Sequence, residues 1–249
     1  MKSVLIQEFR LHYKRVLLTV ALMAGLYILS GVLFALAEPE SKLFNTAMGL
    51  SSLTFTFGTI GLFLWALFKG SGYVGDLIFK DTGYLMKTIP VSSWSLIGGK
   101  MIIGLLEFFV YCVLWTVYVF IVGLSIDMDF YNIFRVLTHR EVQRMILDFF
   151  NLAGCVLVFF IICQAVVNCA ITIFYSVCRH SKWSGLLMGI FVYLFIWFTI
   201  KLFGIFVNFI NFDFFRDAAE LWIPMGILFL ISVVYYVVTC ILYEKKISV

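Results

Sequence analysis

Long apolar runs, rather than alternating apolar and polar positions, dominate the hydrophobic pattern of this chain. A helix that crosses a lipid bilayer needs about 20 mostly apolar residues, and six segments reach this length. Because a helix satisfies its own backbone hydrogen bonds inside a bilayer, these segments are predicted to be helical. The predicted spans are Val16–Ala37, Leu43–Phe68, Met101–Leu124, Phe149–Cys178, Ser184–Val207 and Leu221–Tyr243.

The composition supports lipid as the solvent for most of the 249 residues. Apolar residues make up 63% and charged residues 13%, whereas a typical soluble domain has about 45–50% and about 25%. The 28 Phe, 12 Tyr and 6 Trp residues exclude a disordered chain. A net charge of +4 spread over the chain gives no basic patch, which argues against nucleic-acid binding. The predicted fold class is all-α: a polytopic membrane protein with six transmembrane helices in one domain, residues 1–249.

The distribution of basic residues predicts the orientation in the membrane. Most of the 18 Lys and Arg residues lie in the N-terminal segment, in the connections after the second and fourth spans, and at the C-terminus. Since basic residues concentrate on the cytoplasmic side, both termini are predicted to be cytoplasmic. Acidic residues are concentrated in the opposite connections, which include Asp127–Asp148 and Asn208–Glu220.

The segment before the first span is predicted to lie along the membrane surface. Within residues 1–15, apolar and aromatic side chains such as Val4, Leu5, Phe9 and Tyr13 recur at helical spacing, with basic residues between them. Such a pattern is typical of an interfacial helix in the inner headgroup layer. The alternative is a short basic flank that only sets the topology. Asp127–Asp148 suggests a second interfacial helix on the outer side.

The connection Lys69–Lys100 is the longest predicted inner loop. Glycines end the second span, Tyr73–Lys80 is predicted to be a short amphipathic stretch, and Pro90 prevents a further helix from continuing. Ser92 and Ser93 are expected to cap the helix that enters the third span. Apolar side chains at this water boundary need a cover, either a partner or the chain's own helices; they are Tyr73, Leu77, Ile78, Phe79, Tyr84, Leu85 and Met86.

The sequence predicts no catalytic site and no metal site. It lacks the phosphate-binding GxxxxGK[ST] loop as well as the HExxH and GxSxG motifs. The three histidines, His12, His139 and His180, fall at predicted interfaces on two sides of the membrane and cannot converge on one metal ion. The six cysteines lie inside or at the ends of spans without CxxC pairing, so neither a zinc site nor a disulfide framework is expected.

Polar residues inside the predicted spans are the candidates for a translocation path. Glu107 lies about 10 Å into the third span by helical rise, where a charge is costly and marks a candidate functional residue. It is equally expected to pair with an inner basic residue. On the fourth span Gln164, Asn168 and Thr172 recur every fourth residue, which places them on one helical face. That face meets either another helix or a translocation route, because amides in hydrocarbon need partners.

One segment of the inner connection resembles a known family. Residues Asp81–Ser92 read DTGYLMKTIPVS and are followed by Leu96 and Lys100 at the start of the third span. This segment resembles the loop between the second and third spans of ABC-2 type permeases, which has the pattern YL…TxPVS…K. The predicted layout is similar as well, with an interfacial N-terminal helix, six spans and both ends inside. The long outer segment Asp127–Asp148 departs from the family's pattern.

The resemblance implies the transmembrane subunit of an ATP-driven ABC exporter in the bacterial cytoplasmic (inner) membrane. Its implied partners are a dimer of ABC ATPase subunits and a second permease chain, either identical or paralogous. ATP and Mg would bind to the ATPase, so no cofactor is expected on this chain and the chain is not expected to be an enzyme. The expected cargo is hydrophobic or amphipathic, such as a lipid, a peptide or a drug-like molecule. The residues implied in ATPase coupling are Tyr73, Asp76, Leu77, Lys80, Asp81, Gly83, Tyr84, Leu85, Lys87, Thr88, Pro90 and Ser92.

The implied mechanism is mechanical. Closure of the ATPase dimer would push on Tyr84–Pro90 and tilt the second and third spans, which is a two-state rigid-body switch. Two other classes are alternative hypotheses. One is an ATPase-independent membrane channel or a structural or assembly membrane protein, and the other is an intramembrane enzyme that depends on Glu107.

Overall fold

The structure, a computed structural model, describes residues 2–36, 42–79, 92–125, 140–177, 184–209 and 219–247. Over these ranges the chain is helical, with a turn between α2 and the short helix α3 (Gly75–Phe79). The long helices are α1 (Lys2–Leu36), α2 (Lys42–Phe68), α5 (Ser93–Ser125), α7 (Arg140–Val177), α8 (Ser184–Phe209) and α9 (Ala219–Leu242). Helix α9 continues into a π-helical turn, η2 (Tyr243–Ile247).

Each predicted span falls on one of the long helices. Five helices within the described ranges are long and apolar enough to cross a membrane. The all-helical class is therefore confirmed for this part of the chain, which forms a multi-pass membrane protein. The second predicted span coincides with α2, and a sixth crossing stays a prediction. The five apolar stretches are Val4–Leu29, Ser93–Tyr118, Ala153–Val177, Leu186–Ile205 and Trp222–Lys245.

Several helices extend beyond the apolar runs that predict them. The predicted interfacial helix and the first span form one continuous helix, α1, because residues 2–24 contain neither Gly nor Pro. For the same reason α7 begins at Arg140, inside the predicted outer segment. Helix α5 begins at Ser93, well before the predicted third span. Ser92 caps it, since the Ser92 hydroxyl accepts a hydrogen bond from the Ser95 N–H at 3.4 Å.

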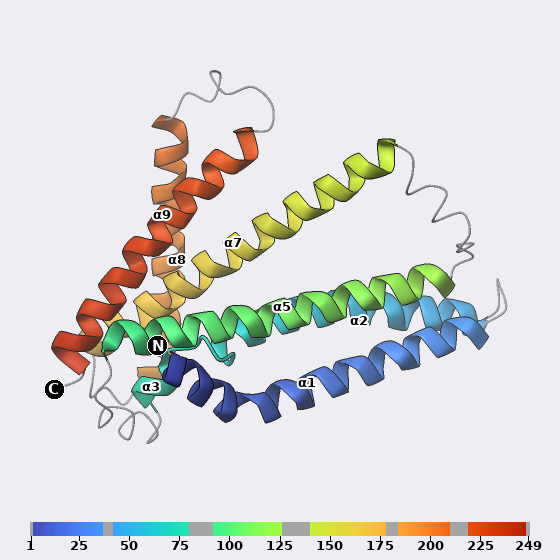
Figure 1. Cartoon of the computed structure of the whole chain (residues 1–249), viewed down its shortest axis with the longest axis horizontal. Coiled ribbons are helices and arrows are strands. Elements are labelled where there is room, and N and C mark those ends of the chain that lie inside the picture. The colour runs from blue at the N-terminus through green and yellow to red at the C-terminus, as the bar shows by residue number, and fades with distance from the viewer. Residues whose placement is uncertain are drawn as a thin grey trace.

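The long helices alternate in direction. Helices α1, α5 and α8 begin, and α2, α7 and α9 end, at one end of the molecule, called the common end here (Figure 1). The start of α1 and the end of α9 lie near each other at this end, while α7, α8 and α9 diverge from α1, α2 and α5 towards the opposite end (Figure 1). Side-chain packing holds the common end together, because a single buried cluster there includes residues from α1, α3, α5 and α9.

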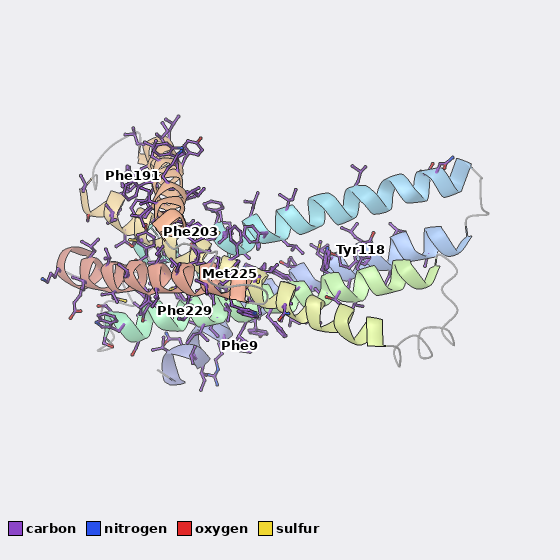
Figure 2. The ribbon with its side chains drawn as sticks, turned by 90° about the horizontal axis from the view of Figure 1, so that it is seen from above. Phe9, Tyr118, Phe191, Phe203, Met225 and Phe229 are labelled. Atoms are coloured by element: carbon purple, nitrogen blue, oxygen red, sulfur yellow. The ribbon has the colours of Figure 1, made fainter. Side chains whose placement is uncertain are left out.

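The described helices bury little of their apolar surface against one another, and α7 is the most enclosed. Its residues Phe160, Val167 and Ile171 join two buried clusters, one with α2 and α5 and the other with α8. Many other large apolar side chains face outwards, such as Phe9 and Phe229 (Figure 2). An outer surface of this kind suits contact with lipid acyl chains.

Candidate functional site

The site forms where the chain leaves α2 and turns into α3, at residues 69–74. The α2 helix closes with the Lys69 N–H donating to the Trp65 carbonyl at 2.8 Å, and the Tyr73 N–H then donates to the Gly70 carbonyl at 3.1 Å. A Cβ at Gly72 would displace the amide of Gln164 and would lie 3.3 Å from the Cα of Gly104, which is a tight contact. Glycine is required at position 104 on α5, since a Cβ there would lie 2.6 Å from the Cα of Gly72. The turn therefore passes in close contact with both α5 and α7.

Asn168 on α7 binds the backbone of this turn. Its Oδ1 accepts a hydrogen bond from the Val74 N–H at 3.0 Å, and its Nδ2 donates to the Gly72 carbonyl at 2.8 Å. These backbone groups have left the α2 helix and would otherwise be buried without partners. The Thr172 hydroxyl donates to the Asn168 carbonyl at 2.8 Å within α7. The amide of Asn168 thus takes the place of the helical partners that the turn has lost.

Glu107 on α5 is the second buried group that binds the turn. One carboxylate oxygen, Oε2, accepts hydrogen bonds from the Ser71 N–H at 2.7 Å and from the Ser71 hydroxyl at 2.6 Å. The same oxygen lies 3.3 Å from a guanidinium nitrogen of Arg15, and Oε1 accepts from the Tyr111 hydroxyl at 2.7 Å. Glu107 thus pairs with a basic residue, Arg15, and the position of Arg15 on the inner side stays a prediction. A buried carboxylate with this many donors is compensated for the loss of water.

A second buried ion pair lies closer to the common end. The Lys100 ammonium lies 3.1 Å from Glu8 Oε2, and His12 Nε2 lies 3.3 Å from the same oxygen. On α1 the basic Arg15 follows the acidic Glu8 by seven residues. On α5 the order of charges is reversed, because the acidic Glu107 follows the basic Lys100 by seven residues. The two parallel helices are therefore joined by two ion pairs in one register.

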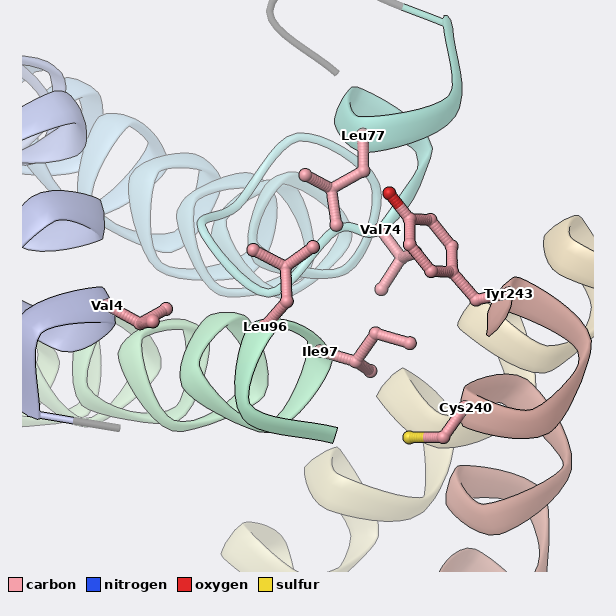
Figure 3. Packing of buried hydrophobic residues seen from close by; sticks show 7 residues of the cluster. All are labelled: Val4, Val74, Leu77, Leu96, Ile97, Cys240 and Tyr243. Atoms are coloured by element: carbon pink, nitrogen blue, oxygen red, sulfur yellow. The ribbon is translucent and has the colours of Figure 1, made fainter. Parts of the chain in front are cut away.

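An apolar layer covers the site on the side of the common end. Val74 and Leu77 pack there with Val4, Leu96 and Ile97, and Cys240 and Tyr243 of the C-terminal helix complete the cluster (Figure 3). Tyr73 is half-buried and packs against a different cluster, the one that joins α7 to α8. Burial raises the pKa of the Tyr73 phenol, and the nearby Asp76 carboxylate raises it further.

The structure describes four of the residues implied in ATPase coupling. Leu77 is buried, Tyr73 and Asp76 are half-buried, and Ser92 is exposed at the start of α5. The sequence predicted that these apolar side chains are covered either by a partner or by the chain's own helices. For Tyr73, Leu77 and Ile78, the chain's own helices cover them. The other coupling residues lie outside the described residues: Lys80, Asp81, Gly83, Tyr84, Leu85, Lys87, Thr88 and Pro90.

The predicted translocation residues are all buried, and three of them meet at the turn. Glu107, Gln164 and Asn168 contact residues 71–74, and Thr172 lies one helical turn beyond Asn168. Their role in translocation stays a prediction. Sequence reasoning missed the partners Ser71, Arg15, Tyr111, Glu8 and Lys100. The matching seven-residue spacing of opposite charges in two segments was the signal that could have found the ion pairs.

No protein-family model, curated protein or solved structure matches this chain. The class that the fold and the site define is a multi-pass helical membrane protein with a buried polar site at one end of its bundle. The site is built to hold backbone and helices in place, because nearly all of its hydrogen bonds join different helices or bind the α2–α3 turn.

Proposed function

We propose that this chain is the membrane-spanning subunit of an ATP-driven exporter of the ABC-2 type, and that residues 80–91 contact a separate ATPase. In this proposal both termini and the common end are cytoplasmic. The single observation that carries it is that the helices on both sides of residues 80–91 are fixed to the helical bundle by buried contacts. A force applied to this segment would therefore reach the transmembrane helices.

The first attachment is the turn and the helix α3, which precede the segment. Glu107 and Asn168 hold the turn to α5 and α7. Leu77 holds α3 against α5 and the end of α9, since it belongs to the same buried cluster as Ile97 and Cys240. Displacement of α3 would break several buried hydrogen bonds at once, so it moves most easily together with the helices around it.

The second attachment is the start of α5, which follows the segment. The Tyr236 hydroxyl on α9 donates to the Trp94 carbonyl at 2.8 Å, and the two rings lie 5.8 Å apart in an edge-to-face arrangement. Two residues further on, Leu96 and Ile97 enter the buried cluster. A push on residues 80–91 would therefore reach α5 by two routes. One is α3, which packs against α5, and the other is the start of α5 itself.

This arrangement suits rigid-body switching. Packed helices respond to a local displacement by shifting as units between two arrangements rather than by deforming continuously. Closure of the ATPase dimer would tilt α2 and α5 against α7 and α9, and would change access between the two leaflets. ATP and Mg would be bound by the ATPase subunits. A second permease chain, identical or paralogous, would complete the translocation path.

An apolar cavity supports a hydrophobic or amphipathic cargo. It has a volume of about 280 Å³ and lies between α2, α5 and α7, beside the residue Tyr111 that binds Glu107. Aromatic side chains such as Phe63, Phe108 and Trp115 line much of it, and Thr116 adds a polar group. A cavity of this character accepts an acyl chain or an aromatic group more readily than a charged solute.

Co-purification with an ATPase tests the proposal. The full chain is extracted from its native membrane in mild detergent, and bound polypeptides are identified by mass spectrometry. A polypeptide with a phosphate-binding loop is expected with the unaltered chain and with Tyr84→Phe. It is expected to be lost with Tyr84→Asp, because a charge replaces an apolar contact at the interface. A stable complex without any such polypeptide would contradict the proposal and favour an ATPase-independent channel or assembly protein.

A further inference from the structure

A hollow of about 780 Å³ lies on the outside of α1 near its N-terminal end and is separate from the buried site. Phe9 and Tyr13 form one part of its wall, with stacked rings whose centroids are 6.3 Å apart. Ile6 and Ile103 add apolar surface from α1 and α5. Phe9 is 60% exposed and projects outwards (Figure 2). The wall is thus mostly apolar and open to the surroundings.

Two cations lie in the same hollow without a countercharge. Arg10 and Lys14 both line it and are both exposed, and their spacing of four residues places them on one face of α1. Neither forms an ion pair within the part of the chain that the structure describes. The one acidic residue of α1, Glu8, pairs with Lys100, and the one acidic residue of α5, Glu107, pairs with Arg15.

The position along α1 indicates the depth of the hollow. Arg10 and Lys14 lie in the first half of the apolar stretch Val4–Leu29, near the N-terminal end of α1. Long basic side chains near the end of a membrane helix extend to the lipid headgroups, which places the two charges at that level. Tyr13 is favoured at that level because its ring is apolar and its hydroxyl meets water, and Phe9 adds apolar surface beside it. An acyl chain or glycerol backbone would cover the apolar wall, and an acidic headgroup would balance the two cations.

We propose that this hollow binds one anionic phospholipid of the surrounding membrane. The lipid phosphate contacts Arg10 and Lys14, and the glycerol and first acyl carbons cover Phe9, Tyr13 and Ile103. The two uncompensated charges select acidic lipids over zwitterionic ones. The bound lipid also holds α1 near α5, where Glu8 and Lys100 pair. This inference does not rest on the transporter proposal.

Lipid retention on the full-length protein tests it. The protein is purified in detergent, titrated with phosphatidylglycerol or with phosphatidylcholine of the same acyl composition, and analysed by native mass spectrometry. One phosphatidylglycerol per chain is expected to bind more tightly than phosphatidylcholine. In Arg10→Gln/Lys14→Gln this binding is expected to weaken roughly 30-fold, since each cation near an acidic headgroup contributes roughly fivefold. Arg10→Lys/Lys14→Arg keeps both charges and is expected to retain the lipid.

The matched control removes two exposed cations elsewhere at the common end. Lys69→Gln/Lys245→Gln lowers the net charge equally but leaves the hollow intact, and it is expected to bind phosphatidylglycerol as the unaltered chain does. Helical circular dichroism and gel filtration check that all variants fold. Equal binding of the two lipids, or equal loss in the two double glutamine variants, would overturn the proposal. So would loss of a self-associated dimer in Arg10→Gln/Lys14→Gln with unchanged lipid binding, because a second copy would then occupy the hollow.

Discussion

At the scale of single residues, the buried site is explained by the backbone that it serves. The chain leaves α2 inside the bundle, so the peptide groups of residues 71–74 lose their helical hydrogen bonds and need side-chain partners instead. Glu107 and Asn168 supply them from α5 and α7. Gly72 and Gly104 allow the close approach that brings these groups within hydrogen-bonding distance. The polar residues inside the apolar helices therefore have a structural task whether or not cargo passes them.

Replacement of Asn168 by Ala tests that task. The Val74 N–H and the Gly72 carbonyl would both lose their partner, and we expect a loss of about 2 kcal/mol or more in unfolding free energy. Thr172→Val, which keeps the volume of this buried side chain, is the matched control on the same helix. Because it removes only a bond to the helix's own carbonyl, it is expected to cost less than about 1 kcal/mol. Reversible denaturant unfolding of the purified protein measures both values, and equal losses would contradict the role given to Asn168.

At the scale of helices, α1 and α5 are held in register by charge. Glu8 pairs with Lys100, and Arg15 pairs with Glu107. An acidic and then a basic residue on α1 thus face a basic and then an acidic residue on α5. A shift of one helix along the other would bring like charges together or leave buried charges unpaired, and both are costly. The ion pairs therefore specify the position of α1 more than they add to stability.

A double-mutant cycle measures this pairing. Lys100→Met and Glu8→Gln each leave one buried group without its partner, and each is expected to cost about 3–5 kcal/mol of unfolding free energy. The double variant removes the pair together and is expected to cost less than the sum of the two single variants, because their effects are coupled. Additive losses in the same unfolding assay would show that Glu8 and Lys100 act independently.

The long helices could be predicted from the sequence, whereas the site they form could not. Apolar runs identify the helices because burial in lipid depends on composition over about 20 residues. Interfacial helices were predicted before the first and fourth spans, but their continuity with α1 and α7 was not, because charged residues such as Arg10 and Arg140 end a hydrophobic run without ending a helix. Glu107 and Asn168 stood out as polar residues in apolar helices. Their common partner, the turn at Ser71–Val74, depends on a three-dimensional approach of three helices that no local pattern encodes.

At the scale of the whole molecule, the common end is fixed and the opposite ends diverge (Figure 1). The site, the buried apolar cluster and both attachments of residues 80–91 all lie at the common end. Large outward-facing apolar side chains cover much of the remaining described surface. The common end is therefore the rigid part, and the diverging helices are the part that can shift as units. In the proposal above, the ATPase acts on the rigid end.

Photo-crosslinking from position 84 in native membranes tests the central claim most directly. A photoreactive residue replaces Tyr84, and the same residue at Tyr193, which is 69% exposed on α8, serves as the control. The proposal predicts a cross-link from position 84, and none from position 193, to a polypeptide that mass spectrometry identifies by its phosphate-binding loop. Cross-links from position 84 that stay within this chain, or that match those from position 193, would contradict the claim that an ATPase binds there.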